Sequence, residues 1–450
     1  MKTLADLSRE LATGVTTSEQ LTRACLERIA DPAGEGAHAF IAVYADSALA
    51  TARATDSMRA VGKVASPLAG IPISIKDLFD IAGEVTRAGS IIQNDAVPAV
   101  ADAPAIARLR AAGAVLVGRT NMTEFAYGAH GINAHYGTPK NPWDRTTGRI
   151  PGGSTSGGAV SVTDGMAAAT IGSDTGGSVR IPSALCGLTG LKPTQARIPL
   201  EGAFPLSTTR DSIGPLAPSV ACCAWLDSAM SAGGMEFQPA ASVKGLHFGV
   251  PTTILLDGLD ASVAEAFQRS LSALSQAGAI IEEFAFPEIA EEAAGSLKAN
   301  FSAVEAYALH RERLARAPEK FDPNVYRRLL LGKDMNAADY YDLLQLRKNL
   351  IASANRTTAR FNAVLCPTTP IVAPTIAGMN ASNEVFLKNN GLLLRNCAPF
   401  NVLDRPALSL PCHRANDAPV GLMMVGESMA DRALLSLAAA VERELVAIRR

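Results

Sequence analysis

The chain has 450 residues, of which 48% are apolar and 19% are charged, a balance that supports a large core and excludes a disordered chain. Lys and Arg number 41 and Asp and Glu number 43, so the net charge of −2 gives no electrostatic reason to expect nucleic acid or a membrane surface as the main partner. The length fits two or three domains of about 150 residues or one large α/β unit, and no apolar run reaches the roughly 18 residues of a membrane span.

The first elements are predicted to be helices. Leu4, Leu7 and Leu11 recur at helical spacing with charged residues between them, which differs from the pattern of a secretory signal peptide. A second helix is expected after a capping box formed by Thr16 and Glu19. A protein with this beginning is expected to be cytoplasmic.

Short apolar strands then alternate with helices. Residues 71–76 alternate isoleucine with Pro, Ser and Lys, which predicts a strand with one apolar face, and Pro72 indicates its beginning or an edge position. Residues 105–112 have a helical pattern that ends at a glycine, and a short strand is predicted over 114–117.

The same order of helix, glycine and strand returns later in the chain. Residues 263–281 repeat it, and two further strands are predicted over 361–366 and 419–425. Residues 430–448 are predicted to close the chain as an amphipathic helix. Helices that alternate with short apolar strands indicate an α/β layered fold.

The cysteines and histidines do not indicate a disulfide framework or a metal centre. The seven cysteines are odd in number and contain no Cys-x-x-Cys pair, so reduced, buried thiols are expected. The six histidines are scattered, and no His-Glu-x-x-His motif occurs. Neither a metal nor a cofactor is predicted.

Residues 151–190 differ from the rest of the chain in composition. Ten of these forty residues are glycine, against 37 in the whole chain of 450, and Ser and Thr lie between them. Within the segment, 160–171 is a candidate helix of small residues and 181–191 is apolar. These features indicate a tightly packed segment in which backbones approach closely.

Four chemistries compete for this segment. Phosphate binding lacks both of its usual glycine motifs, and a Ser-His-Asp hydrolase lacks the Gly-x-Ser-x-Gly elbow at Ser154 and at Ser178. A purely structural role is the simplest interpretation of any single serine. The fourth possibility is a serine nucleophile activated by a neutral lysine, for which Lys76 is the candidate, unless it is a surface residue paired with Asp77 or Asp80.

Several short motifs occur in order along the chain. They are Pro151-Gly-Gly-Ser-Thr-Ser-Gly-Gly-Ala159, Gly172-Ser-Asp-Thr-Gly-Gly-Ser-Val-Arg180, Gly187-Leu-Thr-Gly-Leu-Lys-Pro-Thr194, Gly70-Ile-Pro-Ile-Ser-Ile-Lys-Asp77, Asn121-Met-Thr-Glu-Phe-Ala126, Asp211-Ser-Ile-Gly-Pro215 and Pro419-Val-Gly-Leu422. Together, over roughly residues 4–445, these blocks resemble the amidase signature family. The resemblance implies one large α/β/α domain around a mixed, mostly parallel twisted sheet. It would comprise N-terminal helices (1–65), a catalytic core (66–225) and a C-terminal αβ part (237–450).

The resemblance also implies a Ser-Ser-Lys triad. By motif position Ser178 is the nucleophile, Ser154 is the bridging serine after a cis bond from Gly153, and Lys76 is the base. Ser154-Thr155-Ser156 replaces the usual Ser-Ser pair, which makes Ser156 a supporting hydrogen-bond donor in this assignment.

Further site residues follow from the same motif positions. Backbone N–H groups are expected to form an oxyanion hole, because glycines let a chain turn several amides towards one point. The residues are Thr175, Gly176, Gly177 and Ser178. Candidate substrate contacts are Met122, Phe125, Ser156 and Arg180, although the first two also fit an ordinary core, and Arg180, with Asp174, more readily fits a role in ordering the loop. The segment 379–395 is expected to be a loop that shapes the pocket.

The implied activity is hydrolysis of a small-molecule amide through an acyl-enzyme, without a cofactor. The alternatives are the glutaminase subunit of a tRNA-dependent amidotransferase, which would work with partner chains that bind tRNA, and a binding protein without catalysis. Residues 326–350 look more like stand-alone amidases. A homodimer through the N-terminal helices is also expected from the resemblance.

Overall fold

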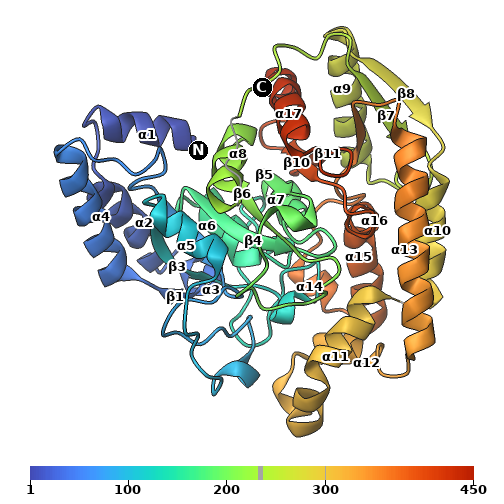
Figure 1. Cartoon of the computed structure of the whole chain (residues 1–450), viewed down its shortest axis with the longest axis horizontal. Helices are drawn as coiled ribbons and strands as arrows, with labels where there is room; N and C mark the ends of the chain where they lie inside the picture. Colours follow the sequence, from blue (N-terminus) through green and yellow to red (C-terminus); the bar gives the residue numbers. More distant parts are fainter. Residues whose placement is uncertain (232–236, 299, 450) are drawn as a thin grey trace.

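Eleven strands form one continuous sheet through the middle of the molecule in the computed structural model, which describes residues 1–231, 237–298 and 300–449 (Figure 1). The order of strands across the sheet is β1-β3-β2-β4-β6-β5-β10-β11-β9-β7-β8. The strands are β1 (Phe40–Val43), β2 (Pro72–Lys76), β3 (Val115–Thr120), β4 (Ala169–Asp174), β5 (Thr189–Lys192), β6 (Ser212–Ala217), β7 (His247–Pro251), β8 (Ile280–Phe284), β9 (Ala363–Pro367), β10 (Ala407–Pro411) and β11 (Gly421–Val425). Residues 299 and 450, within the predicted C-terminal part, lie outside the described residues.

The sheet is mixed, as predicted, but it is not mostly parallel. Only β2–β3, β2–β4, β7–β8 and β7–β9 are parallel pairs. The other neighbouring pairs in the described sheet are antiparallel. The reason is that β5, β6, β10 and β11 meet in the centre of the sheet as antiparallel neighbours, whereas parallel pairs need a crossover connection.

Helices cover both faces of the sheet, so the predicted α/β layered fold is confirmed. The longer helices are α1 (Leu4–Ala12), α2 (Ser18–Ala30), α4 (Ala45–Ala60), α5 (Pro104–Ala111), α6 (Ser156–Thr163), α8 (Val220–Met230), α9 (Ala261–Gln276), α10 (Pro287–Lys298), α11 (Phe301–Arg316), α12 (Pro323–Leu330), α13 (Ala337–Thr358), α15 (Asn383–Arg395) and α17 (Asp431–Ile448). Shorter ones are α3 (Gly36–Ala39), α7 (Arg180–Cys186), α14 (Ile376–Met379) and α16 (Ala398–Val402), with 3-10 turns at Ile91–Gln93, Glu124–Ala126, Gln195–Arg197 and Pro318–Lys320.

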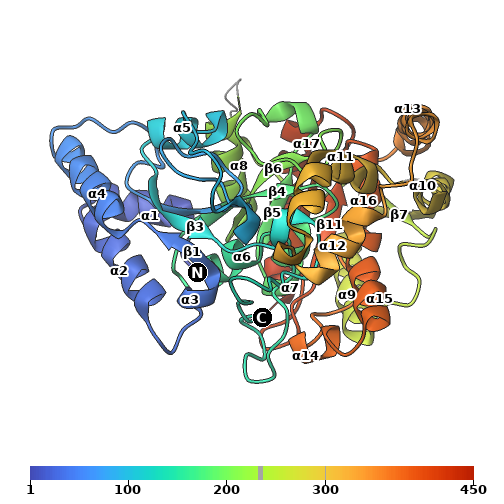
Figure 2. The same cartoon turned by 90° about the horizontal axis from the view of Figure 1, so that it is seen from below.

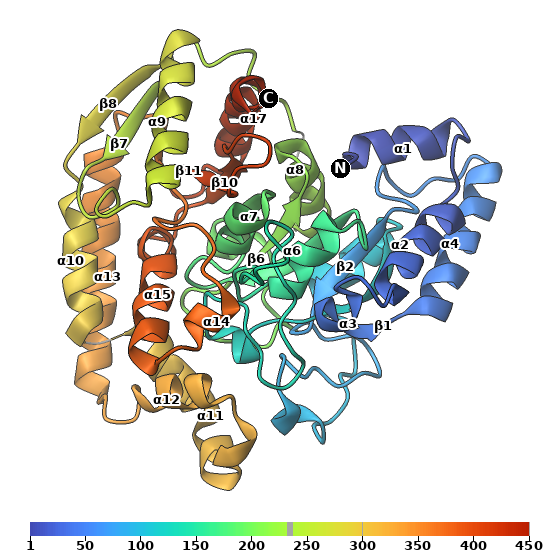
Figure 3. The ribbon, with the colours of Figure 1, turned by 180° about the vertical axis from the view of Figure 1, so that it is seen from behind.

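The helices divide into two layers and two outer groups. On one face α6 and α7 pack against each other and against the central strands, and on the other face α5, α8 and α17 pack together. Figure 2 shows α2 and α4 at one end of the molecule and α10 and α13 at the other. Seen from behind in Figure 3, α10 and α13 again lie side by side, while α6 and α7 lie over the middle of the sheet.

Strand β2 shows why an alternating sequence leads to a buried strand. Pro72 is its first residue, as predicted, but the strand lies between β3 and β4 and not at an edge. Ile73 and Ile75 join the largest apolar core, whereas the Ser74 hydroxyl forms a 2.9 Å hydrogen bond with Ser161 of α6. All five residues are buried, because the polar face of the strand is covered by another helix rather than by water.

Two local predictions are corrected by the structure. Only the beginning of the helix predicted over 160–171 is helical, because α6 ends at Thr163. The end of the predicted helix, from Ala169, belongs to the buried strand β4. A run of Ala, Thr and Ile fits either element when both faces are covered, so periodicity alone could not separate them. The capping box predicted between Thr16 and Glu19 lies one residue further on, between Thr17 and Gln20.

Other predictions from the sequence are confirmed. Leu4, Leu7 and Leu11 are the buried face of α1, and the closing helix spans Asp431–Ile448. All seven cysteines are free and buried. In the described parts of the chain, no helix has both the length and the apolar character needed to cross a membrane.

Two helical glycines give a matched test of how closely α6 packs on the sheet. An added Cβ at Gly157 would meet the backbone of Ala39 and Asn121, whereas an added Cβ at Gly391 of α15 would meet nothing within 4 Å. We expect Gly157→Ala to lower the free energy of unfolding by about 1–3 kcal/mol through overpacking. Gly391→Ala should raise it by about 1 kcal/mol, because alanine is the better helix former.

Urea unfolding followed by circular dichroism checks both substitutions. Equal midpoints for the wild type and Gly157→Ala would show that α6 does not depend on this close backbone contact.

Candidate active site

The glycine-rich segment holds Ser154 just before the start of α6. The peptide bond between Gly153 and Ser154 is cis, as the resemblance implied, and α6 begins two residues later at Ser156. The N–H of Gly153 donates to the carbonyl of Ala129, and the carbonyl of Ser154 accepts from Thr123. Ser154 is therefore held by backbone hydrogen bonds on both sides, with its side chain fully buried.

Lys76 meets Ser154 at the carboxyl end of β2. Its Nζ lies 2.7 Å from Ser154 Oγ and 3.0 Å from Ser173 Oγ, and the side chain is 0% exposed. No carboxylate bonds to it among the described residues, since Asp77 accepts from Gly89 and lies 3.7 Å from Arg119, and Asp80 accepts from Thr86. The alternative of a surface lysine paired with Asp77 or Asp80 is therefore wrong.

Burial changes the acidity of this lysine. It lowers the pKa of Lys76 to about 7, although the negative charges of Asp174 and Asp211 act in the opposite direction. A lysine with such a pKa is partly uncharged at neutral pH, and an uncharged amine has a lone pair that can accept a proton.

Ser178 lies in the loop between β4 and α7. Its residue is 4% exposed, and the described residues offer no hydrogen bond to its hydroxyl. Its carbonyl accepts from both the N–H and the hydroxyl of Thr155, the latter at 2.6 Å. Thr155 follows Ser154 directly, so these two bonds tie the chain at Ser178 to the chain at Ser154.

A buried ion pair shapes the loop that carries Ser178. Asp174, the last residue of β4, accepts from the N–H groups of Gly177 and Val179 and from the Arg180 guanidinium at 2.9 and 3.0 Å. Burial raises the pKa of Asp174, but Arg180 and its hydrogen bonds outweigh this, so the pKa lies well below its ordinary value. Asn401 of α16 bonds to both partners.

The structure reduces the number of N–H donors that can form the predicted oxyanion hole. The Gly177 N–H already donates to Asp174 Oδ1 at 2.8 Å, which removes it from the predicted set. The N–H groups of Thr175, Gly176 and Ser178 make no hydrogen bond within the described residues, so they remain the candidates for the oxyanion hole. Gly177 itself has φ of +125°, and an added Cβ would lie 2.6 Å from Cys397 Cβ, so the turn requires glycine here.

The predicted substrate contacts divide into two kinds. Arg180 is 0% exposed and its donors are satisfied by Asp174, Asn401 and the Cys397 carbonyl, so it orders the loop and cannot anchor a substrate carboxylate. Met122 and Phe125 are buried in the main core, where the Phe125 ring packs on Phe204.

Two further predictions concern Ser156 and the segment 379–395. Ser156 makes a long hydrogen bond, 3.4 Å, to the carbonyl of Asn121. The segment 379–395 is mostly the helix α15 rather than a loop, because Ser382 caps its first turn. Its Leu394 lies beside the loop, since an added Cβ at Gly176 would be 3.3 Å from Leu394 Cδ2.

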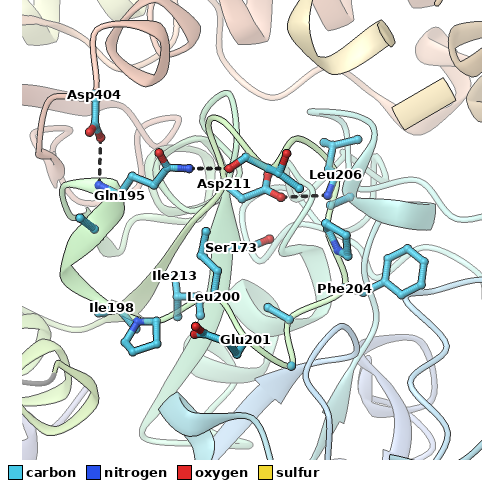
Figure 4. A pocket seen from close by; sticks show the side chains of 17 residues that line it. Ser173, Gln195, Ile198, Leu200, Glu201, Phe204, Leu206, Asp211, Ile213 and Asp404 are labelled. Atoms are coloured by element: carbon cyan, nitrogen blue, oxygen red, sulfur yellow. Dashed lines mark hydrogen bonds between the residues drawn. The ribbon is translucent and has the colours of Figure 1, made fainter. Parts of the chain in front are cut away.

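A cavity of about 860 Å³ adjoins the site on the lysine side. Figure 4 shows Ser173 and Asp211 among the residues that line it, together with apolar side chains such as Leu200 and Phe204. Ser173 and Asp211 were not assigned roles from the sequence, although both lie inside motifs that carry the resemblance. The contact of Ser173 with Lys76 depends on the pairing of β2 with β4, and that of Asp211 with Thr175 depends on the pairing of β4 with β6, neither of which the sequence revealed.

Comparisons with known proteins identify relatives over most of the chain. A family model described as Amidase matches residues 20–435. A glutamyl-tRNA(Gln) amidotransferase subunit from Roseiflexus sp. (strain RS-1) is 35% identical over 98% of this chain and 96% of its own length. The 2-amino-5-chloromuconic acid deaminase of Comamonas testosteroni is 34% identical over 88% of this chain and 86% of its own.

A solved structure agrees as well. A crystal structure described as that of an amidase superposes with a TM-score of 0.89 and 33% identity, over 98% of this chain and 99% of its own. With the family match over most of its length and these relatives, the chain belongs to the amidase signature family of amidohydrolases.

Proposed function

We propose that the chain hydrolyses a linear amide of a small molecule through Lys76, Ser154 and Ser178. The observation that carries the proposal is the hydrogen bond of 2.7 Å between Lys76 Nζ and Ser154 Oγ, buried away from water and from any carboxylate partner in the described chain. A buried lysine without an ion pair is costly unless it is neutral, and a neutral amine beside a serine hydroxyl is a general base.

The proton relay runs from Ser178 to Lys76. Neutral Lys76 accepts the proton of the Ser154 hydroxyl, Ser154 accepts that of Ser178, and Ser178 Oγ forms a bond to the amide carbonyl carbon. When the tetrahedral intermediate collapses, the carbon–nitrogen bond breaks and the leaving nitrogen takes a proton from Lys76 by way of Ser154. Water then attacks the acyl-enzyme by the same relay, and ammonia or an amine and a carboxylic acid are the products.

The developing oxyanion needs donors that are already in place. The free N–H groups of Thr175, Gly176 and Ser178 supply them, and the Asp174–Arg180 pair fixes the loop from which they project. A donor of this kind stabilises the transition state by about 3 kcal/mol, because it does not have to reorganise during the reaction.

The glutaminase component of an amidotransferase is the second candidate. It is favoured by the relative of that enzyme class, which matches this chain as closely as the deaminase does. Small aliphatic, aryl and carboxylated amides, and glutamine, should be tested with ammonia detection. Hydrolysis of one small amide by the chain alone supports the first candidate, whereas glutamine hydrolysis that requires the other amidotransferase chains supports the second.

Ser178→Ala should abolish covalent labelling by a fluorophosphonate probe and lower turnover by at least about a thousandfold, because the nucleophile is lost. Mass spectrometry of the labelled peptide identifies the modified residue in the wild type. Labelling at another serine, or wild-type turnover in a folded Ser178→Ala, would remove Ser178 from the mechanism, and an unlabelled wild type would favour the binding protein.

Ser154→Ala and Ser156→Ala separate the bridging serine from its neighbour. Ser154→Ala should lower kcat by roughly a hundredfold to ten-thousandfold, since proton transfer is interrupted. Ser156→Ala removes only the long bond to Asn121 and should cost less than about tenfold. Steady-state kinetics measures both, and a larger loss in Ser156→Ala than in Ser154→Ala would reverse the assignment.

The rate should rise with pH through neutrality. Burial lowers the pKa of Lys76 to about 7, so the amine is protonated and inactive as a base below that pH and neutral above it. The logarithm of kcat/KM should therefore increase with unit slope below about pH 7 and level off above it. A profile that is flat between pH 5 and 9 would show that Lys76 does not supply the base.

A further inference from the structure

Asp211 is a buried carboxylate beside the nucleophile loop that the proton relay does not use. It lies immediately before β6, whose pairing with β4 brings it next to the loop that begins at Thr175. Its Oδ1 accepts the hydroxyl of Thr175 at 2.5 Å. Its Oδ2 accepts the backbone N–H groups of Leu206 and Ser207 at 2.9 and 3.0 Å.

The two backbone bonds fix the Asp211 carboxylate, and the third bond ties the side chain of Thr175 to it. Thr175 is the first residue after β4, and its free N–H is one of the donors proposed for the oxyanion. The hydrogen bond restricts rotation of the Thr175 side chain. Thr175 is therefore held in place, and so is the orientation of its backbone N–H. Asn in place of Asp211 would remove the negative charge. Its NH2 group would either donate to the Thr175 hydroxyl, which reverses that hydrogen bond, or face the N–H groups of Leu206 and Ser207 and leave them unpaired.

Asp211 also acts on Lys76 through its charge. The lysine feels the negative charges of Asp174 and Asp211, which favour its protonated form. Asp174 is compensated by Arg180, with Lys192 nearby, whereas Asp211 is faced only more weakly by Arg210, which bonds to Ser207 and Ser302 instead. Burial raises the pKa of Asp211 to about 6, but the carboxylate is still charged in the range where the lysine titrates.

We propose that Asp211 is a positioning residue of the amide hydrolase, which holds Thr175 in the oxyanion loop and adjusts the proton balance of the Lys76 relay. This inference rests on the proposed function, because both groups on which Asp211 acts belong to the proposed machinery. It adds to the site a carboxylate that contacts neither the nucleophile nor the general base.

The cavity beside the site supplies a matched control. Glu201 lines the same cavity as Asp211 but is exposed. Glu201→Gln therefore removes the same charge from the same cavity wall without touching Thr175. It should leave both the rate and the pH profile as they are in the wild type.

The test measures how fast a fluorophosphonate labels Ser178 between pH 5 and 9, which requires no knowledge of the natural substrate. In Asp211→Asn the plateau rate should fall by about a hundredfold, as expected when a catalytic group is slightly misplaced. The midpoint of the acid limb should also move to lower pH by roughly one unit, because a charge that favours protonated Lys76 is gone.

Thr175→Val keeps the carboxylate and removes only the hydroxyl. Its plateau should fall as well, while its midpoint moves less than that of Asp211→Asn. It is the smaller change in shape, so it still tests the positioning if Asp211→Asn does not fold. Urea midpoints monitor folding of each variant.

Two outcomes overturn the inference. One is an Asp211→Asn enzyme whose plateau and midpoint equal those of Glu201→Gln, and the other is a Thr175→Val enzyme with the wild-type plateau. Either result, obtained while Ser178→Ala remains unlabelled, refutes the role of Asp211 and leaves the proposed function intact. Undiminished labelling in every variant, Ser178→Ala included, would instead refute the proposed function.

Discussion

The site depends on the removal of water from one lysine. Lys76 ends a strand that is covered on both faces, and among the described residues its amine reaches only hydroxyl and carbonyl oxygens, those of Ser154 and Ser173. Desolvation of an ammonium group without an ion pair favours the neutral amine, and this is the only form that can act as a base. The large buried sheet is therefore part of the chemistry and not merely its support.

A buried ion pair, Asp174–Arg180, orders the loop that carries Ser178. Asp174 and Arg180 are both fully buried, and each satisfies the other while binding the backbone of the loop between them. Such a pair contributes little net stability, since desolvation offsets most of its attraction. Its value lies in ordering, because it fixes the loop in which the N–H groups of Thr175, Gly176 and Ser178 make no hydrogen bond within the described residues.

The motifs of the glycine-rich segment could be recognised in the sequence because they reflect constraints on the backbone. Gly177 must accept a positive φ and a side chain pressed against it, and Gly157 must allow α6 to touch two backbone segments. Residue type and order suffice to express such requirements. The contact between Lys76 and Ser154 joins residues 78 positions apart, and its existence was expected only from the resemblance, while its distance and its burial come from the fold.

The alternation of residues 71–76, the helical leucines of α1 and the spacing of the serines were determined by the sequence alone, because each is a local pattern. Only the tertiary structure decided that β4 is a strand, that antiparallel pairs dominate the sheet, that Gly177 is not a free donor and that Asp211 meets Thr175. These features arise from pairing between distant strands, and the free energy of such pairing depends on partners that no local window of the sequence contains.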